Sequence, residues 1–138
     1  PVASAFLSIN HRLGDASDRY RYGLFVKRCT GKSEAWLEPG TLVAVASFSN
    51  ARRWKKENGT VASYEWIRYA SLPEIRVVGG MGKLLQAFVG EIHPDDVMTY
   101  CDLRWSAGDA YRELGFELEG IMEKPEFSCA KFRLRIAK

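Results

Sequence analysis

A chain of 138 residues has the size of one ordinary globular domain, and its 46% hydrophobic, 27% charged and 12% aromatic residues exclude a disordered or low-complexity protein. The net charge of +3 is compatible with an anionic partner but is too small to indicate one. No apolar run reaches the roughly 18 residues of a membrane span, and the first residues lack the pattern of a signal peptide. We therefore expect a single domain over residues 1–138, cytoplasmic and with no membrane partner.

The three cysteines, Cys29, Cys101 and Cys129, are odd in number and far apart in the sequence. This spacing argues against a disulfide framework and against a zinc site built on CxxC pairs. We expect free, buried thiols and no metal site.

The first half of the chain carries the patterns of a short helix and three strands. Residues 4–10 ("SAFLSIN") predict the helix. Residues 20–29 ("YRYGLFVKRC") and 40–49 ("GTLVAVASFS") are rich in aromatic and branched side chains and predict an antiparallel hairpin with a long connection. Residues 50–59 ("NARRWKKENG") break the pattern with charge and an Asn-Gly turn signal, and residues 60–72 predict a third strand.

The second half predicts a long helix, a strand, a short helix and two strands. From Met81 to Ile92, apolar side chains recur at the spacing of one helix face. Residues 97–103 predict a strand, residues 106–115 a short helix ended by Gly115, and residues 116–122 and 126–136 two final strands. This order predicts an α+β fold of the three-layer α/β type, with a mixed, mostly antiparallel central sheet and helices packed on it.

Three glycines, Gly79, Gly80 and Gly82, stand at the start of the long helix ("VVGGMGKLL"). Glycine costs about 1 kcal/mol relative to alanine inside a helix, so we expect these residues where side chains would obstruct something. The unpaired N–H groups and the positive dipole end of a helix start can cradle a pyrophosphate. Close packing of a neighbouring strand is the alternative explanation.

Together with "AYRELGF" at residues 110–116, this loop makes the chain similar to the GNAT superfamily of acyl-CoA N-acyltransferases, over roughly residues 6–120. The resemblance implies an acyl-CoA N-acyltransferase-like fold, acetyl-CoA or a related acyl-CoA as cofactor, and an amine-bearing acceptor. It places the pyrophosphate loop at Val77, Val78, Gly79, Gly80, Met81, Gly82 and Lys83. Val77 stands near the family's polar lead position and Arg76 is displaced from it by one, but backbone amides can bind a pyrophosphate without that side chain.

Further segments, among them "FLSINHRLG", "YEWIRYAS" and "TYCDLRWSAGDAYRELGF", resemble a subgroup of small phage-encoded GNAT-like proteins. More distantly, they are similar to the phage Mom proteins, which modify adenine in DNA. This resemblance implies a phage or mobile-element origin, DNA modification as the activity and a nucleobase amine as the acceptor.

Acyl transfer to an amine needs a base, donors for the oxyanion and often an acid for the departing thiolate. Tyr111 matches the tyrosine of the family's C-terminal motif and is our candidate acid, because an ordinary phenol keeps its proton at pH 7. Packing in the core is its alternative role. Asp102 and Ser106 are the other candidate catalytic residues, although Asp102 could pair with Arg104, and a helix cap is the role that we favour for Ser106.

Three side chains are candidate substrate contacts: His11, Arg68 and Arg104. Arg104 can bind a phosphate or carboxylate, because a guanidinium contacts such groups bidentately. His11 lies in a phage-like stretch, and histidine is the side chain that ordinarily titrates near neutrality; a structural role is the alternative. Arg68 lies with Glu65 on the third predicted strand, where either residue can line the cleft.

The basic loop, residues 52–56, arranges Arg52, Arg53, Lys55 and Lys56 around a tryptophan. This composition can follow phosphates and stack a base, so Arg52 and Arg53 are further candidate substrate contacts and the loop is a candidate nucleic-acid interface. A solvated hairpin tip is the more ordinary interpretation.

The sequence leaves three functions open: an acyltransferase that acts on a nucleobase, an acetyltransferase that acts on a small amine, and a non-catalytic nucleic-acid-binding module with the GNAT fold. A deep slot beside Gly80 and Gly82 would favour an enzyme. Basic residues that converge on that slot would favour a nucleic-acid acceptor.

Overall fold

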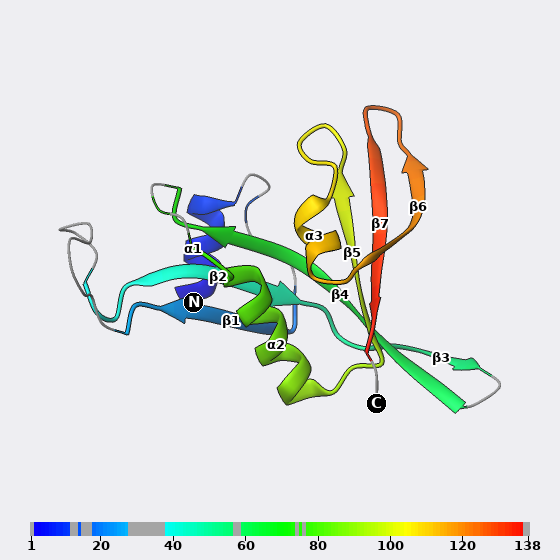
Figure 1. The fold of residues 1–138 in the computed structure, drawn as a ribbon, viewed down its shortest axis with the longest axis horizontal. Coiled ribbons are helices and arrows are strands. Elements are labelled where there is room, and N and C mark those ends of the chain that lie inside the picture. Colours follow the sequence, from blue (N-terminus) through cyan, green and yellow to red (C-terminus); the bar gives the residue numbers. More distant parts are fainter. Residues whose placement is uncertain are drawn as a thin grey trace.

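The computed structural model describes residues 2–11, 14, 18–27, 38–56, 59–73, 75 and 77–136. Within these ranges the chain forms three helices and seven strands (Figure 1). Their order is α1 (Val2–Asn10), β1 (Tyr20–Phe25), β2 (Leu42–Phe48), β3 (Arg52–Lys56), β4 (Gly59–Ser71), α2 (Gly80–Ile92), β5 (Asp96–Asp102), α3 (Asp109–Glu113), β6 (Glu117–Glu123) and β7 (Ser128–Arg135). The predicted α+β class is confirmed.

The strands form one mixed sheet in the order β1-β2-β4-β5-β7-β6, with β3 paired to β4 beside this path. Among the described strands, only β4 and β5 pair in parallel, and every other pair is antiparallel. The helix α2 lies in the crossover between these two parallel strands, as a parallel connection requires. The predicted mixed, mostly antiparallel sheet is therefore confirmed.

Helices cover both faces of the sheet. Successive strand residues point to opposite faces, and in β2 Ala46 and Phe48 join one core cluster while Val45 joins the other. The first cluster also contains Leu84 and Phe88 of α2, and Tyr111 of α3 packs against it. The second cluster contains Phe6 and Leu7 of α1. The three layers predicted from the sequence are thus present, with α1 on one face and α2 and α3 on the other.

Aromatic rings join α2 to the sheet. The ring of Phe88 stacks on Phe48 at a centroid distance of 3.9 Å, and Phe48 stacks in turn on Trp66 at 5.4 Å. Aromatic pairs in such arrangements contribute about 1 kcal/mol each beyond the area that they bury. This packing holds the second half of α2 against β2 and β4.

The strands β4 and β5 separate after a short paired stretch. Their register covers three pairs, from Ser63 with Asp96 to Glu65 with Met98, although both strands continue further. Beyond this point the hydroxyl of Thr99 donates a hydrogen bond to the Trp66 carbonyl at 3.0 Å. A register shift between β2 and β4 at Ile67 also marks a β-bulge, which redirects the following side chains. The two parallel strands therefore form a cleft that opens toward their carboxyl ends.

The expectation for residues 50–59 was wrong. We predicted an interruption between two strands, whereas Arg52–Lys56 is strand β3, which pairs with the first residues of β4. The strand lies beside the main path of the sheet, and Arg52, Arg53, Trp54 and Lys55 are exposed, so no apolar alternation marks it. Asn58 of the predicted turn signal, Cys29 and most of the long connection between β1 and β2 lie outside the described residues.

No helix in the described ranges is long and apolar enough to cross a membrane.

Candidate functional site

The glycine-rich loop before α2 contains a left-handed turn at Gly79 and close packing around Gly80. Gly79 has a left-handed backbone with φ of 70°, a conformation that side chains disfavour. At Gly80, a Cβ atom would lie 2.7 Å from the Tyr69 hydroxyl oxygen and 2.9 Å from Cγ1 of Val77. Packing therefore accounts for part of the glycine pattern, because Tyr69 on β4 and Val77 on the loop close around Gly80.

The start of α2 also leaves backbone donors available. The N–H of Gly80 donates to the Val77 carbonyl at 3.2 Å, and the N–H of Lys83 donates to Gly79 at 3.0 Å. Within the described residues, the N–H groups of Met81 and Gly82 have no backbone acceptor. These donors lie at the positive end of the helix dipole, where an anionic oxygen is stabilised.

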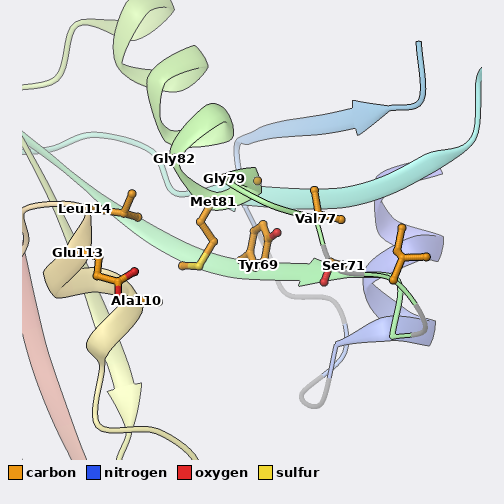
Figure 2. A pocket seen from close by; sticks show the side chains of 11 residues that line it. Tyr69, Ser71, Val77, Gly79, Met81, Gly82, Ala110, Glu113 and Leu114 are labelled. Carbon is orange, nitrogen blue, oxygen red and sulfur yellow. The ribbon is translucent and has the colours of Figure 1, made fainter. Parts of the chain in front are cut away.

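A slot of about 430 Å³ lies between the start of α2 and α3 (Figure 2). Five of the seven predicted cofactor residues line it, namely Val77, Gly79, Gly80, Met81 and Gly82. The side chain of Val78 is 76% exposed, and neither Val78 nor Lys83 lines the slot. The other lining residues are Tyr69, Ser71 and Ile75 on the β4 side and Ala110, Glu113 and Leu114 on the α3 side.

A second cavity of about 580 Å³ occupies the cleft between β4 and β5. Tyr69, Met81 and Ala110 line both the slot and this cleft cavity, so the two meet at these residues. The remaining lining residues of the cleft cavity are His11, Glu65, Ile67, Arg68, Tyr100, Cys101, Asp102, Arg104, Trp105, Ser106, Tyr111, Lys124, Phe127 and Cys129. The structure thus brings together all three candidate catalytic residues and His11, Arg68 and Arg104.

Tyr111 is both a packing residue and a cavity residue. Its ring lies 5.8 Å from Trp66, 5.7 Å from Phe116 and 6.0 Å from Phe132, measured between ring centroids. Burial raises the pKa of the phenol, and a hydrogen bond with Thr99 opposes this effect. Tyr111 therefore keeps its proton at neutral pH while it lines the cleft.

Asp102 and Arg104 form an ion pair with each other. The guanidinium of Arg104 donates to both carboxylate oxygens of Asp102, with an Nη2–Oδ2 distance of 2.8 Å, and the Arg104 backbone N–H donates to Oδ1 at 3.0 Å. The guanidinium also lies 4.2 Å from the ring centroid of Phe127. These contacts leave Asp102 less available as a base than Glu65, whose carboxylate lies 3.6 Å from the exposed Arg52.

Ser106 stabilises the turn that enters α3. Its hydroxyl oxygen accepts a hydrogen bond from the N–H of Gly108, the residue before the helix, at 3.0 Å. Its backbone carbonyl accepts a hydrogen bond from the thiol of Cys101 at 3.3 Å, and burial raises the pKa of that thiol. Cys101 and Cys129 are both buried and free.

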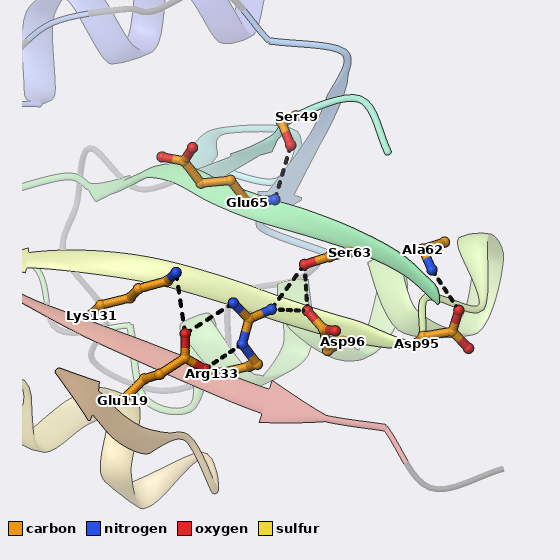
Figure 3. Close-up of polar contacts among 9 residues, drawn as sticks. All are labelled: Ser49, Ala62, Ser63, Glu65, Asp95, Asp96, Glu119, Lys131 and Arg133. Carbon is orange, nitrogen blue, oxygen red and sulfur yellow. Dashed lines mark hydrogen bonds and ion pairs between the residues drawn. The ribbon is translucent and has the colours of Figure 1, made fainter. Parts of the chain in front are cut away.

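A network of polar side chains joins four strands at the closed end of the cleft (Figure 3). Arg133 on β7 contacts Asp96 on β5 at 2.6 Å, Ser63 on β4 at 3.1 Å and Glu119 on β6 at 2.5 Å. Lys131 contacts Glu119 at 3.1 Å, and Ser63 donates a short hydrogen bond to Asp96. The hydrogen bonds to Arg133 and Lys131 lower the pKa of Glu119 to about 2. The network holds the strands together where the cleft begins.

The basic loop lines neither cavity, although the guanidinium of Arg52 lies 3.6 Å from the carboxylate of Glu65 on the cleft wall. Neither Arg52 nor Arg53 lines the slot or the cleft cavity. Their strand β3 and the start of β4 form the end of the molecule farthest from α1 in Figure 1. The basic residues therefore do not converge on the glycine slot.

Several cavity residues were not singled out from the sequence. Tyr69 reaches the slot because the β-bulge at Ile67 changes the alternation of β4, and no sequence signal marks a bulge there. Lys124 and Phe127 reach the cleft from the turn between β6 and β7, which the Lys124 N–H closes with the Phe127 carbonyl at 2.8 Å. The described residues contain no group of three or more His, Cys, Asp or Glu side chains that could hold a metal ion.

No model of a known protein family matches the chain, and no curated protein matches it. Solved structures do match. A chain of the NatC complex bound to Gag peptide and CoA aligns with 97% of this chain and 88% of its own length, at a TM-score of 0.64 and 15% identity. A GNAT-family acetyltransferase from Desulfovibrio desulfuricans aligns with 72% of this chain at a TM-score of 0.58 and 16% identity, and the chain spans 65% of that protein's length.

A third similar structure is Arabidopsis thaliana Naa50 in complex with the bisubstrate analogue CoA-Ac-MVNAL. It aligns with 72% of this chain and 70% of its own length, at a TM-score of 0.52 and 16% identity. The chain therefore has the fold of the GNAT acetyltransferases, as the loop at residues 77–83 and the motif at residues 110–116 implied.

Proposed function

We propose that this protein is an acyl-CoA-dependent N-acyltransferase. The observation that carries the proposal is the meeting of two cavities at Tyr69, Met81 and Ala110: a glycine-walled slot at a helix start and a cleft with acid–base side chains. A substrate that extends from the slot into the cleft would place its phosphates at the start of α2 and its reactive end among the acid–base side chains. Two of the similar structures are named as complexes with CoA or a CoA analogue, which supports an acyl-CoA as the cofactor.

The slot fits a pyrophosphate. The N–H groups of Met81 and Gly82 have no backbone acceptor within the described residues, and a side chain at Gly80 would obstruct the same wall. These residues, with Val77 and Gly79, would hold the cofactor by backbone contacts. When bound, an acyl-CoA supplies a thioester whose acyl carbon is activated toward an amine.

The chain's own residues supply the proton chemistry of the cleft. Tyr111 holds a proton at its hydroxyl, inside the cavity where a departing sulfur needs one. Glu65 is the carboxylate best placed to take the proton that an ammonium loses before it attacks, because Arg104 occupies both oxygens of Asp102. Ser106 acts as a positioning residue for α3 and hence for Tyr111.

The acceptor is an amine. The NatC and Naa50 structures are named with peptides, so a peptide N-terminus is one acceptor to test. The resemblance to phage-type proteins makes a nucleobase amine a second, and the match to solved structures favours neither over a small amine. A thiol-release assay with acetyl-CoA tests the function on all three: peptides such as MVNAL, small primary amines, and adenine-containing DNA. Turnover with any of them supports the proposal, and release no faster than hydrolysis without acceptor would refute it.

The alternative function is a non-catalytic nucleic-acid-binding module. The observation that favours it is the exposed strand β3, which carries Arg52, Arg53 and Lys55 next to Trp54 in the sequence, and Trp54 is 38% exposed. Fluorescence anisotropy of a labelled single-stranded DNA measures this binding directly. Under this alternative the Arg53→Glu variant loses binding and the wild-type affinity falls with added salt. Equal anisotropy for both proteins would exclude the basic loop as the interface.

A further inference from the structure

We infer that the acceptor carries an anionic group, a carboxylate or a phosphate, besides its amine, and that Arg68 binds this group in the cleft cavity. The inference rests on the proposed function, because it names the chemical class of the acceptor.

The β-bulge in β4 places Arg68 in the cleft. In the register with β2, Arg68 lies opposite Ser47 and Trp66 opposite Phe48, so Ile67 is the inserted residue. The side chain of Arg68 is half-buried and lines the cleft cavity on its β4 wall. An arginine at this point of the strand therefore faces the space where we place the acceptor.

The known contacts of Arg68 use only part of its guanidinium. Its Nε–H donates to the Gly14 carbonyl at 3.2 Å, and Nη1 donates to the Ile67 carbonyl at 3.1 Å. A guanidinium has five N–H donors in a planar fork. Backbone carbonyls carry no full negative charge, and no carboxylate in the described part of the chain forms an ion pair with Arg68.

The other charges of the cavity do not compensate Arg68. Asp102 is paired with Arg104, and the carboxylate of Glu65 has its nearest cation, Arg52, outside the cavity. Lys124, on the opposite wall, is exposed and lies 5.5 Å from the ring centroid of Phe127. Among the described residues, Arg68 and Lys124 are therefore two cations of the cavity wall that form no ion pair with a carboxylate, which favours an anionic ligand over a neutral one.

Both parts of such an acceptor have a partner on β4. Glu65 serves the amine, and Arg68, three residues further along the same strand, serves the anionic group. A guanidinium recognises a carboxylate or a phosphate through the same pair of parallel hydrogen bonds. The chemistry that the site recognises is therefore an amine and an oxyanion in one small molecule or one terminal residue.

The test uses three acetylated probes that need no turnover: N-acetylglycine, N-acetyl-O-phosphoethanolamine and the neutral N-acetylglycinamide. Each is titrated into the ¹⁵N-labelled protein, and the indole N–H signal of Trp105, which lines the cavity, reports binding. We expect at least one anionic probe to bind about tenfold more tightly than the amide, which corresponds to one charge-assisted contact. The tighter of the two anionic probes distinguishes a carboxylate from a phosphate.

Variants show whether Arg68 is responsible. In Arg68→Gln the preference for the anionic probe should disappear while the affinity for the amide stays the same. Arg53→Gln, which removes an exposed cation that lines neither cavity, should leave the preference intact. If Arg68→Gln does not fold, Arg68→Lys replaces it, and this variant should lose most of the preference because it lacks the planar fork.

Three outcomes would overturn the inference. The first is equal affinity of the protein for the three probes, and the second is a preference for the anionic probe that survives in the Arg68 variant. The third is no saturable binding of either anionic probe up to about 50 mM, a concentration well above the millimolar dissociation constants of weak specific ligands. An equal loss of affinity for charged and neutral probes would show that Arg68 only fastens the backbone at Gly14. Acetyl-CoA is titrated separately into the same samples. Its failure to bind would refute the acyltransferase proposal alone, since the probes report on Arg68 without CoA.

Discussion

Tyr111 combines a packed aromatic ring with a hydroxyl group in the cleft, and one substitution separates these roles. Tyr111→Phe keeps the ring contacts with Trp66 and Phe116 and removes the proton that we assign to the departing sulfur. We expect kcat to fall about 100-fold, the usual scale for a lost general acid, with acetyl-CoA affinity almost unchanged. Steady-state kinetics and calorimetry measure the two quantities. Tyr64→Phe, a buried tyrosine outside both cavities, is the matched control, and an equal small effect of both changes would assign Tyr111 to packing alone.

The two ends of α2 contain glycines in opposite surroundings. Gly80→Ala should destabilise the protein by about 1–3 kcal/mol, because its Cβ would press on Tyr69 and Val77. Gly90→Ala should stabilise it by about 0.5–1 kcal/mol, since the new Cβ meets nothing within 4 Å in an exposed part of the helix. Urea denaturation measures both free energies of unfolding. The same sign for the two variants would contradict the close approach at Gly80.

At the scale of elements, the Arg133 network joins β4 and β5 at the paired end of the cleft. The carboxylate side chain of Asp96 is only 7% exposed, so Arg133→Met would leave a buried charge without its partner. We expect a loss of about 3 kcal/mol in the free energy of unfolding. The double variant Arg133→Met with Asp96→Leu should recover much of this loss, because two apolar side chains can replace a buried ion pair. A double variant as unstable as Arg133→Met would show that the pair itself stabilises the strands.

The same scale shows which elements the sequence could predict. The helix α2 could be predicted because its apolar residues repeat on one face, which packs on the sheet. It was expected from Met81 to Ile92 and begins one residue earlier, at Gly80. The strand β3 was missed because Arg52, Arg53 and Lys55 are charged and exposed on both faces, so no apolar periodicity marks it. The bulge at Ile67 depends on how β4 pairs with β2, which is a property of two segments and not of one.

At the scale of the whole molecule, acid should weaken the fold through Glu119. Arg133 and Lys131 lower the pKa of its carboxyl to about 2, below the ordinary value of 4.5, so the ionised form is favoured in the folded state. This contribution is complete above pH 4.5 and is lost as the pH falls toward 2. Because the side chain is a third exposed, we expect about 1 kcal/mol.

Urea denaturation of wild type and Glu119→Gln at several pH values measures this contribution. The difference between the two proteins should be present at pH 6 and should vanish near pH 2. Glu123→Gln, an exposed carboxylate on the same strand, is the control and should show no such dependence. A difference that stays constant between pH 6 and pH 2 would contradict the role of the ion pair.

The candidate site was partly predictable because its residues belong to motifs that are local in the sequence. Residues of the loop at 77–83 line the slot, and Asp102, Arg104 and Ser106 line the cleft cavity. His11 and Arg68 line the cleft cavity as well. The basic loop does not, because the pairing of β3 with the start of β4 carries it to the far end of the molecule. The charge composition of residues 52–56 does not indicate on which part of the fold the basic loop lies.

The measurement that tests the central claim most directly is calorimetric titration of acetyl-CoA into wild type, Ala110→Phe and Ala87→Phe. Ala110 is an exposed residue of α3 at the junction of the two cavities, so a phenylalanine would fill the passage without entering the core. Ala87 is equally exposed on α2 and lines neither cavity. We predict micromolar binding to wild type and Ala87→Phe and a loss of at least about tenfold in Ala110→Phe. No binding to wild type, or equal binding to all three proteins, would contradict an acyl-CoA site in these cavities.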